Sequence, residues 1–263
     1  MLGPAAILEA TFAAFAAGAV NAVSGGGTLL TFPVLLGLEA NGVIANATST
    51  VALWPGVASA MWGYRGELRG ARSWALLLLG PCLAGGIIGS YLLLRTPRGQ
   101  FDRIAPFLVL AATLLFMASG LVSRWLKSAG REVKAADEDQ LHFSWRTVGY
   151  LLFQLAVSIY GGYFGAGIGI LMLAALGMMG LKNIHRMNGL KGWAAFCTNG
   201  IAVVIFAANR LIDWPIALVM AVASIAGGYA GARMARHVGQ VVVRRMIIGV
   251  GLLATASLLL RRL

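Results

Sequence analysis

The chain has 263 residues, of which 59% are hydrophobic and only 11% are charged, and its mean hydropathy is +0.81. A soluble domain carries about 25% charged residues, so this composition excludes an ordinary soluble protein. The formal net charge is +12, but Arg and Lys lie mostly in short segments between apolar runs. We therefore expect membrane lipid headgroups as partners of these charges, and no nucleic acid.

Lys, Arg, Asp and Glu are absent from a series of long runs, most of them the length of a membrane-spanning helix, about 20 residues. In chain order these runs cover residues 10–38, 40–64, 73–94, 104–123, 147–181, 192–209 and 214–232, and a shorter one covers 246–260. We predict an all-α, multi-pass protein of the bacterial inner membrane. Because no positive charge precedes Arg65, we expect no cleavable signal and a first helix that is retained.

A constant shift of 142 residues aligns the two halves of the chain. It matches Gly25 with Gly167, Gly27 with Gly169, Asn41 with Asn183, Asn46 with Asn188, Arg103 with Arg245, and Gly85, Gly86 and Gly89 with Gly227, Gly228 and Gly231. We predict a duplication, with membrane repeats at 1–123 and 147–263 and a polar linker at 124–146. We expect the repeats to be inverted, and the last two glycine groups to allow close helix packing.

Each half opens with a run that is too long for one straight helix. Residues 147–181 would span about 52 Å as a helix, whereas the bilayer core measures roughly 30 Å. The glycines between Gly161 and Gly169 show where this run breaks, and residues 21–28 form the matching break in the first half. Paired, glycine-interrupted segments in two halves point to the central site of a transporter.

Further motifs follow these breaks. In the first half, Gly25 to Pro33 is a Gly-rich break with a Pro-containing half-helix, and a helix of small residues enters through Asn46. In the second half, 160–169 is followed by 188–191 and 198–200. Over nearly the whole chain this combination resembles the TauE/SafE family, which implies export of sulfite or an organosulfonate. Family members often have Lys directly after the first-half Asn, where this chain has Ala47, so no cationic contact is expected there.

A half-helix that starts inside the membrane presents unpaired N–H groups and the positive end of its dipole, and both favour an anion. The candidate substrate-binding residues are Gly25, Gly26, Gly27, Thr28, Asn46, Ser49, Gly167, Gly169, Asn188, Lys191, Thr198 and Asn199. Lys191 stands out because a charge at this depth is costly and is by default functional. The alternative is a lysine whose side chain reaches back to the interface.

Three classes of function stay open. A secondary transporter of a small sulfur-containing anion, without a cofactor, fits best; an anion channel of other specificity is the alternative. A membrane enzyme is less favoured, because no metal motif, aspartate pair or nucleophile–base pair is present. Glu9 and Glu39 lie close to helix ends, and Cys82 and Cys197 lie inside apolar runs, so we predict neither an acid relay nor a disulfide or metal site. The oligomeric state stays open.

Overall fold

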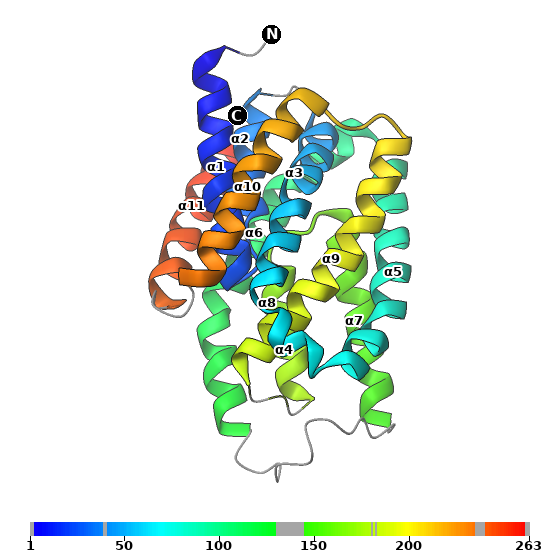
Figure 1. Ribbon diagram of the computed structural model, residues 1–263. Coiled ribbons are helices and arrows are strands. Elements are labelled where there is room, and N and C mark those ends of the chain that lie inside the picture. The colour runs from blue at the N-terminus through cyan, green and yellow to red at the C-terminus, as the bar shows by residue number, and fades with distance from the viewer. Residues whose placement is uncertain are drawn as a thin grey trace.

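The computed structural model describes residues 3–38, 41–129, 145–179, 181, 183–234 and 240–260, and within these ranges it contains helices and no strand. The helices are α1 (Pro4–Val23), α2 (Thr28–Leu38), α3 (Gly42–Gly63), α4 (Arg65–Arg69), α5 (Arg72–Arg95), α6 (Arg98–Ala129), α7 (Trp145–Tyr163), α8 (Ile168–Met178), α9 (Ile184–Ala208), α10 (Trp214–Met234) and α11 (Gln240–Leu260). Figure 1 shows them as one bundle with most helices along a common axis. The predicted all-α class is confirmed.

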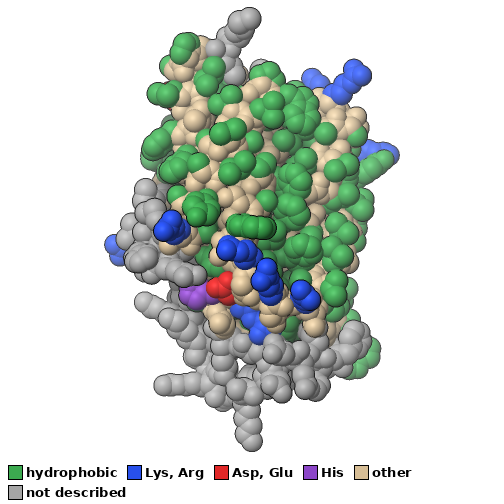
Figure 2. Space-filling view, in the orientation of Figure 1, with side chains coloured by type: hydrophobic (Ala, Val, Ile, Leu, Met, Phe, Trp, Pro, Cys, Tyr) green, Lys and Arg blue, Asp and Glu red, His purple; other side chains and the backbone are tan. Residues whose placement is uncertain are grey.

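Five of the described helices are long and apolar enough to cross a membrane: Pro4–Val23, Arg72–Arg95, Arg98–Ala118, Ile184–Ala208 and Trp214–Arg233. Large apolar side chains also cover the outside of the bundle, among them Phe12 and Leu253, which are 75% and 73% exposed. Figure 2 shows apolar side chains over most of one face, with a band of Lys and Arg side chains below them. This surface suits lipid rather than water, and the chain is a multi-pass membrane protein as predicted.

Two sequence predictions fall partly outside the described residues. The polar linker was expected at 124–146; residues 130–144 are not described, whereas α6 continues to Ala129 and α7 begins at Trp145. Glu39 also lies outside the described residues. Glu9 is exposed on α1, so it is not part of a buried site.

The order of helices in the first half recurs in the second. Both α2 and α8 are 11-residue helices that follow a break, and each precedes a long helix, α3 or α9. Asn41 and Asn183, which a shift of 142 residues matches, both cap the long helix with their side chains. Gly25 and Gly167, matched by the same shift, have φ angles of 76° and 78°. These equivalent details support the predicted duplication.

Helices α3 and α9 are equivalent in the two halves and run antiparallel. The Tyr64 ring, at the end of α3, lies 6.4 Å from the His185 ring at the start of α9. At the other end, the Asp213 N–H, just beyond α9, donates a 3.0 Å hydrogen bond to Thr48 Oγ1 near the start of α3. An inverted repeat requires this antiparallel relation; the inverted arrangement of the complete halves stays a prediction.

One helix of each half packs mainly against helices of the other half: α5 packs against α7 and α9, and α10 packs against α1 and α3. In α5, Gly85 and Gly89 lie directly against the backbone of α7, and Gly86 lies against α9. In α10, Gly227 lies against α1 and Gly228 against α3. A Cβ at any of these positions would overlap the facing helix, so these glycines serve close helix packing, as predicted. Each half of the chain is therefore packed against a helix of the other half.

Candidate functional site

Both predicted helix breaks are present at the centre of the bundle. Helix α1 ends at Val23 and α2 begins at Thr28; α7 ends at Tyr163 and α8 begins at Ile168. In the first break Gly25 has a positive φ, a conformation that other L-residues rarely adopt. In the second break two glycines, at 165 and 167, have positive φ angles of 80° and 78°. The glycines thus allow two tight turns where spanning helices would otherwise continue.

The two breaks meet at their glycines. The backbones of Gly25 and Gly169 are in contact, because a Cβ built on either residue would lie 2.7 Å from the Cα of the other. Gly169 also lies against the Lys191 side chain, whose Cδ is 3.2 Å from the position of such a Cβ. This crossing brings the amino ends of α2 and α8 to the same region of the bundle.

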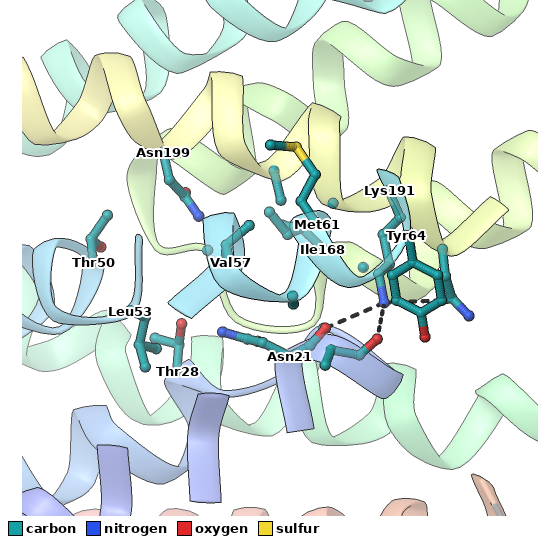
Figure 3. A pocket seen from close by; sticks show the side chains of 18 residues that line it. Asn21, Thr28, Thr50, Leu53, Val57, Met61, Tyr64, Ile168, Lys191 and Asn199 are labelled. Carbon is teal, nitrogen blue, oxygen red and sulfur yellow. Dashed lines mark hydrogen bonds between the residues drawn. The ribbon is translucent and has the colours of Figure 1, made fainter. Parts of the chain in front are cut away.

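A cavity of about 40 Å³ lies between α3 and α9 and the two breaks (Figure 3). It is lined by Asn21 and Ala22 from the end of α1, by Gly25 and Thr28 at the first break, by Thr50, Leu53, Val57, Ala60 and Met61 from α3 and Tyr64 directly after it, by Gly165, Ile168 and Gly169 at the second break, and by Asn188, Lys191, Gly192, Ala195 and Asn199 from α9. On the same scale a water molecule needs roughly 10–15 Å³, so the cavity holds roughly three waters or one compact polyatomic ion.

Lys191 is the one Lys or Arg among the residues that line this cavity, and only 3% of it is exposed. Its Nζ donates hydrogen bonds to the carbonyl oxygens of Asn21, at 3.3 Å, and Ala22, at 3.4 Å, and to Asn188 Oδ1 at 3.1 Å. Figure 3 shows the lysine reaching across the cavity toward Asn21. Within the described part of the chain no carboxylate pairs with it. The positive charge therefore has only neutral oxygen partners.

The amino ends of α2 and α8 contribute backbone donors near this charge. Among the described residues, the N–H groups of Thr28, Ile168 and Gly169 have no hydrogen-bond acceptor. The N–H of Gly27 is already used, because it donates to Asn21 Oδ1 at 2.7 Å. Each half-helix also directs the positive end of its dipole to this region. The cavity thus combines a lysine charge, free backbone donors and two helix amino ends, all of which favour an anion.

Of the residues predicted to bind substrate, Gly25, Thr28, Gly169, Asn188, Lys191 and Asn199 line the cavity. The structure does not bring the others to it. Gly26 is in close contact with the Phe116 ring of α6, and Gly27 lies against Asn21 and α1. Gly167 caps α8 beside Ala112.

The remaining predicted residues make hydrogen bonds elsewhere in the core. Asn46 Nδ2 donates to the Tyr163 carbonyl at 3.0 Å. The hydroxyls of Ser49 and Thr31 are hydrogen-bonded at 2.6 Å. Thr198 Oγ1 donates to the carbonyl of Cys82 at 3.4 Å, so it points toward α5. These side chains hold the helices around the breaks together rather than line the cavity.

Sequence reasoning did not select three polar residues of the cavity, Asn21, Thr50 and Tyr64. Asn21 was recognised only as the start of a break, although it is a polar residue in a long apolar run. Thr50 and Tyr64 belong to a stripe on α3 whose members are three or four residues apart, which is the spacing of one helix face. Among the described residues, no group of three His, Cys, Asp or Glu side chains is placed to hold a metal ion.

Comparisons with known proteins agree with the sequence and the geometry. The family model described as "Sulfite exporter TauE/SafE" matches residues 10–258. A "Probable membrane transporter protein" of Haemophilus influenzae is 28% identical over 93% of this chain and 91% of its own length. The "Probable membrane transporter protein YfcA" of Escherichia coli is 24% identical over 98% of this chain and 91% of its own length. No solved structure matches significantly. The chain therefore belongs to the sulfite exporter TauE/SafE family.

Proposed function

We propose that this chain carries a small oxidised-sulfur anion, sulfite or an organosulfonate, out of the cell through the cavity between α3 and α9. As a member of its family the chain is a membrane transporter and not an enzyme. The sulfur chemistry of the substrate is suggested by the family's description and by the resemblance of the two break motifs. The proposal concerns which anion is carried, and where it binds.

The observation that carries the proposal is the charge of Lys191 on the wall of this cavity. An ionised group taken out of water costs several kcal/mol unless a partner compensates it. Asn21, Ala22 and Asn188 supply only partial negative charges to the ammonium group. A bound anion would supply a full one, and it would also satisfy the free N–H groups of Thr28 and Gly169. Anion binding is thus the condition in which these groups are all paired.

The electrical driving force agrees with export. With a negative cell interior, each negative charge that leaves gains about 2.3 kcal/mol per 100 mV of membrane potential. The cavity also has room for an ion with few heavy atoms, as sulfite has, but not for a large organic anion. Size and charge together favour a compact anion.

Ligand-dependent thermal unfolding in detergent tests the proposal. Sulfite, sulfoacetate, taurine, thiosulfate and sulfate would be compared with chloride at equal ionic strength. A ligand at 100 times its Kd stabilises the folded state by about 2.7 kcal/mol, which is a clear rise in Tm. The best ligand would then be used in liposome flux, where saturation and counterflow indicate a carrier and not a channel.

Lys191→Met is the matching variant, because it removes the charge and keeps an unbranched side chain. We expect it to fold and to lose both the ligand-induced rise in Tm and the flux. Arg98→Gln, which removes an exposed positive charge at the start of α6, is the control and should behave as the wild type. Oxidised-sulfur anions that give no more stabilisation or flux than chloride would show that the substrate class is wrong.

A further inference from the structure

The hydrogen bonds of Lys191 have the form of an occupied cation site. A lysine ammonium has three donors, and here three oxygens accept them: the carbonyls of Asn21 and Ala22 and the side-chain oxygen of Asn188. Asn21 and Ala22 belong to the last turn of α1, which ends at Val23, so their carbonyls are at the negative end of that helix. Carbonyl and amide oxygens at the end of a broken helix are the ligands that transporters present to small monovalent cations.

The equivalent break, at the end of α7, shows that the carbonyl oxygens of a broken helix can be hydrogen-bonded without a positive charge. A shift of 142 residues matches Asn21 with Tyr163 and Lys191 with Ser49. The Tyr163 carbonyl accepts a hydrogen bond from the neutral amide of Asn46 at 3.0 Å. Ser49 bonds to the hydroxyl of Thr31 instead. The carbonyl end of α7 therefore accepts a hydrogen bond from a neutral side chain, whereas the carbonyl end of α1 accepts hydrogen bonds from the charged ammonium group of Lys191.

In the described lining of the cavity, no other strong acid or base lies beside the ammonium group. Among the described residues that line the cavity beside it, α1 supplies Asn21 and Ala22, α3 supplies Tyr64, and α8 supplies Gly169. The phenol of Tyr64 is the one other titratable group in that lining, and the His185 ring packs on its side at 6.4 Å. Within this described lining, Lys191 is therefore the basic group that is placed to exchange a proton with cavity water.

We propose that the carbonyl end of α1 is a monovalent-cation site filled by the ammonium group of Lys191, and that proton exchange on this lysine couples anion transport to proton movement. The proposal rests on the anion transport proposed above. In the exchange step the ammonium gives one proton to cavity water, which yields a neutral amine and a hydronium ion; only an N–H bond breaks. With the ammonium present the cavity attracts an anion strongly, and without it only the weaker attraction of the free N–H groups and the two helix amino ends is left. By linkage the anion and the proton then bind together and leave together.

The first experiment measures proton movement by the wild-type protein in liposomes that contain a pH-sensitive dye. The substrate is an alkanesulfonate, because its own acid is fully ionised and cannot carry a proton. We expect an outward sulfonate gradient to move protons in the same direction, about one per anion. A monovalent sulfonate then moves without net charge, whereas a divalent anion such as sulfite keeps one net negative charge and with it the electrical driving force for export. Arg98→Gln should keep this ratio. Sulfonate flux without proton movement would overturn the coupling and leave the transport function intact, whereas absence of any flux of oxidised-sulfur anions would contradict the function itself.

The second experiment tests the cation site without transport. Lys191→Ala leaves the three oxygens without their cation, so Na⁺ or methylammonium should bind there and raise Tm by about 3 °C at tenfold excess over Kd, while choline is too large. The wild type should not respond, because its own ammonium fills the site. Lys191→Ser, which copies the first half, is a second variant in case the first does not fold. Equal cation responses of the variants and the wild type would overturn the site.

Discussion

Asn21 Oδ1 accepts a 2.7 Å hydrogen bond from the Gly27 N–H, and this bond joins the end of α1 to the beginning of α2. The backbone carbonyl of the same asparagine accepts a hydrogen bond from Lys191. The side chain of Asn21 therefore binds the amino end of α2, and its backbone carbonyl binds the ammonium group of Lys191 in the cavity. Its substitution separates the requirements of folding from those of anion binding.

Asn21→Asp is predicted to keep stability and lose function. The carboxylate still accepts from Gly27, and a negative charge at the amino end of α2 stabilises by about 0.3–1 kcal/mol. The same charge next to Lys191 repels the substrate anion, so anion binding should weaken at least tenfold. Unfolding and ligand-binding titrations in detergent measure the two effects. Asn41→Asp, at a similar cap outside the cavity, is the control; normal anion affinity of the Asn21→Asp variant would contradict the prediction.

Gly169→Ala is predicted to destabilise the crossing of the two breaks. The new Cβ would lie 2.7 Å from the Gly25 Cα and 2.8 Å from the Ser24 carbonyl oxygen, and neither backbone atom can move away cheaply. Such overpacking costs about 1–3 kcal/mol, and displacement of the α8 amino end should abolish flux. Gly80→Ala in α5 meets no atom within 4 Å and serves as the control. Thermal unfolding and liposome flux check both variants, and normal flux of the first would disprove the close approach.

Asn199→Leu is predicted to fold at least as well as the wild type and to transport poorly. Asn199 Oδ1 is buried and has no hydrogen-bond partner among the described residues, although the side chain lines the cavity. An unpaired buried acceptor costs about 1–3 kcal/mol, which an apolar side chain of similar size avoids. If the oxygen serves substrate or its water, flux should fall several-fold while Tm stays or rises. A fall in both Tm and flux would instead assign Asn199 a structural role.

The arginines beside Tyr64 are predicted to attract anions toward the cavity. Arg65 and Arg69 belong to α4, which follows Tyr64 directly, and both are exposed. The double variant Arg65→Gln, Arg69→Gln should slow anion association several-fold at low salt, and the difference should vanish near 1 M salt, where the Debye length is about 3 Å. Stopped-flow binding measures this rate. The control pair, Arg95→Gln with Arg98→Gln, lies at the other end of α5; an equal effect there would refute local steering.

The sequence was sufficient to predict the two breaks and the position of Lys191 inside the membrane region, for reasons of length and solvation. A run of 147–181 is longer than a bilayer allows, so it had to bend, and glycines mark the bend at 165 and 167. Lys191 is recognisable because a charge followed by a long uncharged run is costly in a membrane. Neither argument requires knowledge of which helices are neighbours.

The sequence did not predict in the same way which face of each helix lies toward the cavity. On α9, Asn188, Lys191 and Asn199 share one face, whereas Thr198 is turned toward α5. Helical spacing shows that Thr198 and Asn199 point in different directions, but only the packing against α5 decides which one lies in the cavity. Gly26, a predicted substrate-binding residue, does not line the cavity for a related reason: it contacts an aromatic ring of α6, far away in sequence.

The exchange of α5 and α10 between the halves bears on how such a chain arose. A half-length ancestor with this packing would have exposed the grooves that now receive the glycines of α5 or α10. Under the predicted duplication, such a half would have needed a second copy to supply the missing helix.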